Sequence, residues 1–222
     1  MTTNINENSD SKFEINNYKF ENVKEFKYLG SMISNKGGNQ IDIKARLMSA
    51  NRCYYALIDV LKSRQLSRKL KLKIYKTIIR PIAIFGSECW TLTTPDERLL
   101  IVWERKILRK ILGAINDNGT WRVRKNKEIA DIYQEPDIIV IIKRNRLRWL
   151  GHLLRMDEDK TTQRIFRGNP GGKRKRGRPR KRWMDEVTED LRVLGINNWK
   201  EKAMDRVCWS AIVEEAKILQ GL

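Results

Sequence analysis

Histidine and cysteine are scarce in this chain, which limits the chemistry that it can carry out. His152 is the only histidine, so no Ser-His or Cys-His base system can be built elsewhere in the sequence. It lies within a predicted helix, where a structural hydrogen-bonding role is favoured over catalysis. The three cysteines, Cys53, Cys89 and Cys208, are far apart and form no CxxC pair, which argues against a disulfide framework and a zinc cluster.

Adjacent aspartate pairs are also missing. No two aspartates are adjacent, although metal-assisted phosphoryl chemistry needs grouped carboxylates to hold its ions. Pro136-Asp137 resembles the first half of a nuclease metal motif, but the next acid is Asp157, beyond a predicted helix. No glycine loop of the P-loop type occurs. The sequence therefore predicts no catalytic residue, no metal site and no cofactor of its own.

Long hydrophobic runs are absent as well. Apolar runs such as Ile138 to Ile142 are far shorter than the roughly 20 residues of a membrane span, so we expect no membrane contact. The first ten residues, MTTNINENSD, are polar and acidic, and we expect no signal peptide. Apolar residues still make up 41% of the 222 positions, enough for one large or two small domains.

Positive charge is abundant and unevenly distributed. Lys and Arg number 46 against 27 Asp and Glu, which gives a net charge of +19. Residues 31–95 carry 12 basic and 3 acidic groups, and residues 136–184 carry 16 and 4, whereas the other segments are near neutral or acidic. This pattern favours a directed surface for nucleic acid over a uniformly charged one.

The densest run of charge is the segment 173–182, KRKRGRPRKR, in which eight of ten residues are basic. Gly177 and Pro179 disfavour a helix there, and a packed core does not accommodate so many unpaired charges. We expect the run to lie in water or against a polyphosphate backbone. A solvated loop or a nuclear-import address is the alternative, and we expect a nuclear location. The predicted phosphate contacts are Lys173, Arg174, Lys175, Arg176, Arg178, Arg180, Lys181 and Arg182.

Within this run, Arg176-Gly177-Arg178-Pro179 resembles the RGRP core of the AT-hook. An extended Arg-Gly-Arg segment can lie in a narrow A·T minor groove, where the potential is most negative. The alternative is that the segment only tethers phosphates.

Patterning along the chain predicts short strands followed by helices. Two β-like runs, Phe13 to Phe20 and Phe26 to Ile33, predict a small antiparallel pair, with turn signals at Asn16-Asn17 and Gly37-Gly38. Apolar residues at spacings of three and four then predict an amphipathic helix from Gln40 to Leu61, with Asn39 as its cap.

Ser67 is the predicted cap of a second helix, from Arg68 to Arg80. Its expected apolar face is Leu70, Ile74 and Ile78, and the cations Lys69, Lys73 and Lys76, predicted to bind nucleic acid, lie mostly off that face.

Thr94-Pro95-Asp96-Glu97 has a cap, an early proline and acids at the positive end of the helix dipole, and predicts a third helix that ends at Gly113. Its expected buried stripe is Leu99, Trp103, Ile107 and Ile111. Trp121 in the following loop either stacks on a base or plugs the edge of the core.

The remaining chain predicts a short helix at 126–134 and a longer one from Asp137 to Met156, which turns cationic at Lys143, Arg144, Arg146 and Arg148. Of these, Arg144, Arg146 and Arg148 are predicted phosphate contacts. A linker then leads into the basic run, and two acidic helices follow, from Trp183 to Leu194 and from Trp199 to Ala216.

Five segments occur in an order that resembles the C-terminal part of non-LTR (LINE-type) retrotransposon reverse transcriptases. They are FKYLGSMIS, IKARLMSA, KIYKTIIRPIAIFGSECW, RLRWLGHLLRM and GRPRKRWMDEV, and the resemblance covers about residues 13–218. It implies that Tyr28, Leu29 and Gly30 match the turn that supports the primer end at the palm–thumb junction. It also implies thumb-like helices that grip a template–primer duplex.

The family is an RNA-directed DNA polymerase, but the paired aspartates of its palm have no match here. We therefore expect no polymerase activity from the chain alone and a separate palm- or endonuclease-bearing polypeptide as a possible partner beside DNA or RNA. The predicted fold is mainly α: a helical thumb-like bundle with a small N-terminal β-hairpin and a C-terminal helical subdomain joined by a basic linker. The expected regions are a disordered tail 1–12, the hairpin 13–38, the thumb-like region 39–124, a helical region 125–167, the linker 168–182 and a helical pair 183–222.

Three functional hypotheses remain open at this point. The first is a nucleic-acid-binding remnant of a reverse transcriptase. The second is a host-adopted architectural DNA-binding protein that places Arg176 and Arg178 in the minor groove. The third is a protein-interaction module that works through the acidic C-terminal helices.

Overall fold

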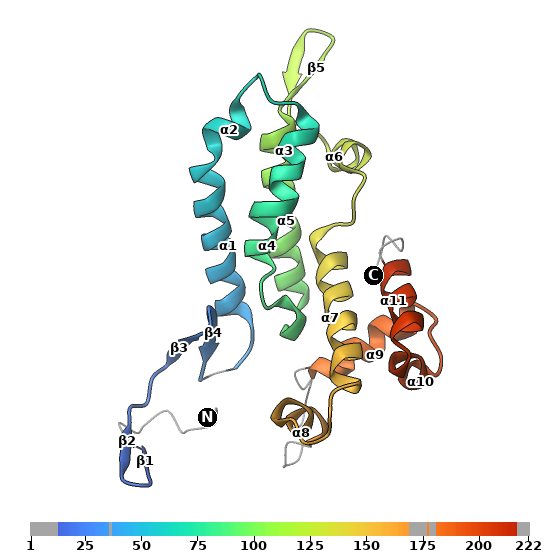
Figure 1. Cartoon of the computed structure of the whole chain (residues 1–222). Helices are drawn as coiled ribbons and strands as arrows, with labels where there is room; N and C mark the ends of the chain where they lie inside the picture. Colours follow the sequence, from blue (N-terminus) through green and yellow to red (C-terminus); the bar gives the residue numbers. More distant parts are fainter. Residues whose placement is uncertain (1–12, 36, 169–176, 178–180, 217–222) are drawn as a thin grey trace.

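The computed structural model describes residues 13–35, 37–168, 177 and 181–216, and this part of the chain is mainly helical (Figure 1). A small hairpin region at the N-terminal end and a group of C-terminal helices flank a bundle of longer helices. These features confirm the predicted mainly-α fold class. The expected tail of residues 1–12 and most of the basic linker lie outside the described residues.

Each of the two N-terminal β-like runs forms its own hairpin. Strand β1 (Phe13–Ile15) pairs antiparallel with β2 (Tyr18–Phe20), and β3 (Glu25–Tyr28) pairs with β4 (Ser31–Ser34). The two-residue turns, Asn16-Asn17 and Leu29-Gly30, have positive φ angles at both positions, as tight hairpin turns of this kind require. The predicted pairing of one run with the other is therefore replaced by two local pairings, and Gly37-Gly38 instead leads into the first helix.

Seven helical segments build the central bundle. They are α1 (Gln40–Ala56), α2 (Ile58–Lys62), α3 (Arg68–Ile74), the π-helix η1 (Tyr75–Ile79), α4 (Arg80–Ala83), the 3-10 helix η2 (Ser87–Cys89) and α5 (Thr94–Leu112). The Ser67 hydroxyl accepts a hydrogen bond from the Leu70 amide, which confirms the predicted cap of α3. Thr93, one residue before the expected cap, forms a reciprocal capping box with Asp96 at the start of α5.

The buried face of α3 and η1 differs from the predicted one. Leu70 and Ile78 are exposed, whereas Lys71, Tyr75 and Ile79 are buried. The Tyr75 hydroxyl donates to Glu104 of α5 at 2.7 Å, and this polar anchor selects the neighbouring stripe. An expectation based on apolar residues alone misses that choice because both stripes are largely apolar.

Beyond α5, a hairpin of β5 (Ile115–Asp117) and β6 (Thr120–Arg122) precedes α6 (Asn126–Tyr133) and α7 (Ile138–Leu154). The Asp137 carboxylate caps α7 by accepting from two backbone amides. Glu104 accepts a third, from Ile138 at 2.8 Å, so one buried carboxylate joins η1, α5 and α7. Helix α8 (Thr161–Arg167) follows at the end of the expected helical region 125–167, although no separate helix was predicted there.

The C-terminal helices are α9 (Trp183–Val193), α10 (Trp199–Met204) and α11 (Arg206–Glu215), and α10 and α11 replace the single last helix expected from the sequence. Asp205 makes the break because its side chain accepts hydrogen bonds from the first amides of α11. Val207, expected in the apolar stripe, is 80% exposed.

Helix α7 belongs to two hydrophobic cores. Its first turns, with Ile138 and Ile142, pack in the core of α1, α5 and their neighbours. Its later turns, with Leu147 and Leu150, pack with Trp209 of α11 and the other C-terminal helices. Helix α7 thus joins the central bundle and the C-terminal helices (Figure 1).

Candidate nucleic-acid interface

The stretch from residue 60 to residue 87 carries eight basic side chains and no acidic one. Five of the eight are exposed on α2, the following loop and α3: Lys62, Arg64, Arg68, Lys69 and Lys73. No acidic side chain within the described ranges pairs with any of these five, which we call the α2–α3 cation cluster. Two predicted contacts, Lys69 and Lys73, lie in this cluster.

The other cations of that stretch have internal roles. Lys71 is buried, and Arg80 donates to the Tyr133 hydroxyl at 2.8 Å. Lys76, the third predicted contact on this element, lies 2.6 Å from Glu135 and is partly buried. Lys76 therefore does not belong to the α2–α3 cation cluster with Lys69 and Lys73, because Glu135 already neutralises its charge.

Arg146 is withdrawn as a phosphate contact because its side chain is only 1% exposed. Its guanidinium pairs with Glu186 and Asp190 of α9 and lies 3.4 Å from the Trp90 carbonyl oxygen. The sequence held a signal for this arrangement. Arg146 lies four residues from Ile142 and from Leu150, within the apolar stripe of α7, and its two acidic partners are also four residues apart.

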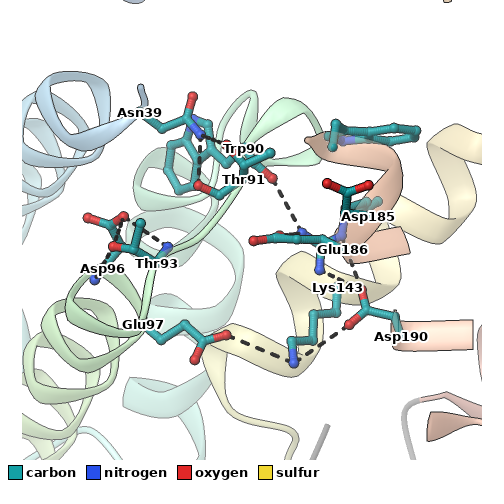
Figure 2. Close-up of polar contacts among 12 residues, drawn as sticks. Asn39, Trp90, Thr91, Thr93, Asp96, Glu97, Lys143, Asp185, Glu186 and Asp190 are labelled. Carbon is teal, nitrogen blue, oxygen red and sulfur yellow. Dashed lines mark hydrogen bonds and ion pairs between the residues drawn. The ribbon is translucent and has the colours of Figure 1, made fainter. Parts of the chain in front are cut away.

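Lys143 closes the same polar junction from the side. Figure 2 shows its ammonium group between the carboxylates of Glu97 on α5 and Asp190 on α9, at 3.9 and 3.7 Å. The indole of Trp183 on α9 also donates to the Glu88 carbonyl at 2.7 Å. These contacts fix the C-terminal helices against the central bundle.

The two remaining predicted cations of α7 lie on a different side of the helix from Arg146. Arg148 is exposed and Arg144 is half-buried. Burial lowers the pKa of the Arg144 guanidinium from its ordinary value, and the nearby charge of Arg148 lowers it further. Both cations remain available to a phosphate.

Tyr28, Leu29 and Gly30 form the tip of the second hairpin, where Tyr28 is 57% and Leu29 80% exposed. The start of β4, directly after this turn, is anchored to α1, because Asp42 accepts from the Met32 amide at 2.8 Å and Arg46 donates to the Ser31 hydroxyl at 3.1 Å. Their role as a primer-supporting turn stays a prediction.

Only three residues of the basic run, Gly177, Lys181 and Arg182, are among those that the structure describes. Lys173, Arg174, Lys175, Arg176, Arg178 and Arg180 lie outside the described residues. Lys181 and Arg182 are described and exposed, and the Arg182 amide donates to Asp185 at the start of α9. The described C-terminal end of the basic run therefore leads directly into α9, the first of the C-terminal helices.

Trp121 on β6 is 70% exposed, so the expectation that it plugs the core edge is wrong. The neighbouring Arg122 is paired with Asp117 and Glu128, which raise the pKa of its guanidinium. Stacking of the exposed Trp121 indole on a base therefore stays a prediction. The charge of Arg122 is already neutralised by its two acidic partners.

A pocket that the sequence analysis missed lies between α7 and α11, with a volume of about 580 Å³. Arg148, Trp149 and His152 of α7 line it together with Arg206 and Trp209 of α11. The signal in the sequence is the recurrence of Arg and aromatic residues at helical spacing in RLRWLGH, but the partner helix was predicted with different bounds.

The described residues contain no group of three or more histidine, cysteine, aspartate or glutamate side chains arranged to hold a metal ion. None of the helices in the described ranges has the length and apolar character needed to cross a membrane.

Comparison with known proteins finds one relevant relative. An uncharacterized transposon-derived protein of Caenorhabditis elegans is 23% identical over 201 residues, which covers 88% of this chain and 72% of that protein. No family model matches the chain, and no solved structure matches it. The relative indicates a transposon-related origin.

Proposed function

We propose that this chain is the nucleic-acid-gripping C-terminal region of a retrotransposon reverse transcriptase, which holds a template–primer duplex or target DNA through phosphate contacts. The observation that carries the proposal is the α2–α3 cation cluster, with five exposed cations in a stretch that lacks acidic residues. The transposon-derived relative supports the same origin. Bond formation is assigned to a palm-bearing polypeptide, because no catalytic constellation is recognised among the described residues.

Phosphate contacts suit such a role. Cations that neutralise phosphates release condensed counterions, and this gain does not depend on base sequence. An A-form-like RNA–DNA hybrid is recognised through its shape and backbone, so a polymerase can move along it without sequence preference. We place this activity in the nucleus, where the basic run also suits an import address.

The test compares three ligands for the full chain by fluorescence anisotropy: a primer–template hybrid, an A·T-rich DNA duplex and a duplex of mixed sequence. Tighter binding to the hybrid supports the proposal. Preference for the A·T-rich duplex, lost when Arg176 and Arg178 are replaced by alanine, supports the architectural alternative instead. Absence of binding to all three contradicts both and favours a protein-interaction module.

A further inference from the structure

The pocket between α7 and α11 is built by one face of each helix. Residues 145, 148, 149 and 152 of α7, its C-cap residue 155, and residues 206, 209, 210 and 213 of α11 line it, mostly at spacings of three and four. Its volume of about 580 Å³ lies within the ~300–1,000 Å³ that small-molecule sites occupy. The two helices therefore border an open pocket whose volume suits one nucleotide.

Gly151 and Trp209 keep the floor of this pocket rigid. A Cβ atom at Gly151 would lie 2.3 Å from the Trp209 ring, so only glycine permits this approach of the helices. The Trp209 indole donates to the Leu147 carbonyl at 2.9 Å, and the residue is 2% exposed. The packing of α11 on α7 at the floor of the pocket is therefore fixed without a ligand.

One wall of the pocket is aromatic. The rings of Trp149 and His152 lie with their centroids 5.2 Å apart at an interplanar angle of 38°. Trp149 is partly buried, whereas His152 is exposed. A partly buried indole that also lines an open pocket offers a face on which a base can stack.

Three arginine side chains bring positive charge to the pocket. Arg148 and Arg206 are both exposed, and a third arginine, Arg155, is fixed by a hydrogen bond to the Ala203 carbonyl. Glu88 and Glu214 also line the pocket, and the charge of Glu214 acts on Arg144 next to it. The three arginines outnumber the two glutamates, so a phosphate is favoured beside the aromatic wall.

We propose that the α7–α11 pocket binds one unpaired nucleotide of a nucleic-acid strand, with its base on Trp149 and its phosphate on Arg148 and Arg206. This inference rests on the proposed function, because the strand is delivered by the cations of the scaffold. It adds a site for a single-stranded end or an extruded nucleotide to a surface that otherwise holds duplex backbone.

The experiment measures the affinity of the full chain for three hybrids: one with a one-nucleotide overhang, one with an abasic residue at that overhang, and one with blunt ends. The wild type should bind the base-containing overhang at least ~5-fold more tightly than the abasic one, as expected for one stacked base. Trp149→Ala should abolish this preference, so that the variant binds the base-containing and the abasic overhang with equal affinity. Trp149→Tyr, which keeps a ring, should retain part of the preference.

Tyr18→Ala is the control, because it removes an exposed aromatic side chain on β2 outside the pocket, and it should keep the preference intact. Arg148→Ala combined with Arg206→Ala should weaken overhang binding more than blunt binding. Equal affinity of the wild type for the base-containing and abasic overhangs overturns the pocket proposal while leaving the proposed function standing. Competition by a free nucleoside monophosphate without any overhang preference overturns the strand-borne assignment. Loss of binding to all hybrids in the wild type contradicts the proposed function itself.

Discussion

The guanidinium of Arg146 on α7 meets the carboxylate of Asp190 on α9 inside the protein, with Nε 3.1 Å from Oδ2. Glu186, one helical turn earlier on α9, pairs with the same guanidinium. Burial raises the pKa of Glu186 even though the charge of Arg146 opposes that shift. Because desolvation offsets much of the attraction in a buried pair, we interpret this trio as a device that orients the C-terminal helices on the central bundle.

Replacement of Arg146 by methionine should therefore be costly. It leaves the buried Glu186 carboxylate without its charged partner and Asp190 with Lys143 alone, and loss of one member of such a group costs about 3–5 kcal/mol. Urea denaturation checks the change in free energy of unfolding. Arg192→Ala is the control, because its exposed pair with Glu189 should contribute less than about 1 kcal/mol. A loss at Arg146 no larger than that at Arg192 would contradict the orienting role.

Gly151→Ala should destabilise the packing of α11 on α7. The added methyl group would overlap the Trp209 ring, and overpacking of this kind costs about 1–3 kcal/mol. Thermal unfolding followed by tryptophan fluorescence measures the effect. Trp209→Leu in the Gly151→Ala background should cost less than it does alone, since the smaller side chain relieves the overlap. Strict additivity of the two substitutions would show that the residues do not compete for space.

Glu104 and Glu128 should give opposite pH dependences of stability. Burial raises the pKa of Glu104 above its usual 4.5, so its contribution to stability is greatest at low pH and is lost as the pH rises through that range. Arg122 lowers the pKa of Glu128 to about 2, so its contribution is present above pH 4.5 and is lost as the pH falls.

The measurement is the free energy of unfolding at several pH values for the wild type, Glu104→Gln and Glu128→Gln. The wild type minus Glu104→Gln difference should fall as the pH rises above 4.5, whereas the wild type minus Glu128→Gln difference should rise as the pH rises from about 2 to 4.5 and stay constant above that. If both differences in the free energy of unfolding change in the same direction as the pH rises, one of the two carboxyl groups is not in the environment described.

Lys69→Ala combined with Lys73→Ala should weaken binding to duplex without changing stability, because both side chains are exposed and unmatched by any described acid. Each lost phosphate contact should reduce the slope of log affinity against log salt concentration by about 0.9. Lys76→Ala is the matched control on the same segment, since its charge is already paired with Glu135. Equal losses for the double variant and for Lys76→Ala would remove the α2–α3 cation cluster from the interface.

The sequence predicted local features well where one residue determines the geometry. Ser67 caps α3, Gly113 ends α5 with a φ of 75°, and α7 begins at Asp137 as expected. Such signals depend on residues that are close together in the sequence, so tertiary contacts do not change them.

The errors arose where distant contacts decide. From the sequence, Arg146 was predicted to be a surface cation, because its partners Glu186 and Asp190 on α9 lie about 40 residues away. The buried stripe of α3 and η1 likewise depends on Glu104, which lies 29 residues after Tyr75. Asp205 divided the last helix because its side chain caps α11, which helical periodicity does not reveal. The α7–α11 pocket was missed for the same reason, since its walls come from two helices far apart in sequence.

The most direct test is the affinity of the full chain for a primer–template hybrid as the salt concentration is raised. If the cations of the scaffold hold about eight phosphates, the slope of log affinity against log salt should be near −7 on a duplex. No measurable affinity in dilute buffer, or a slope flatter than about −2, would contradict a phosphate-gripping surface.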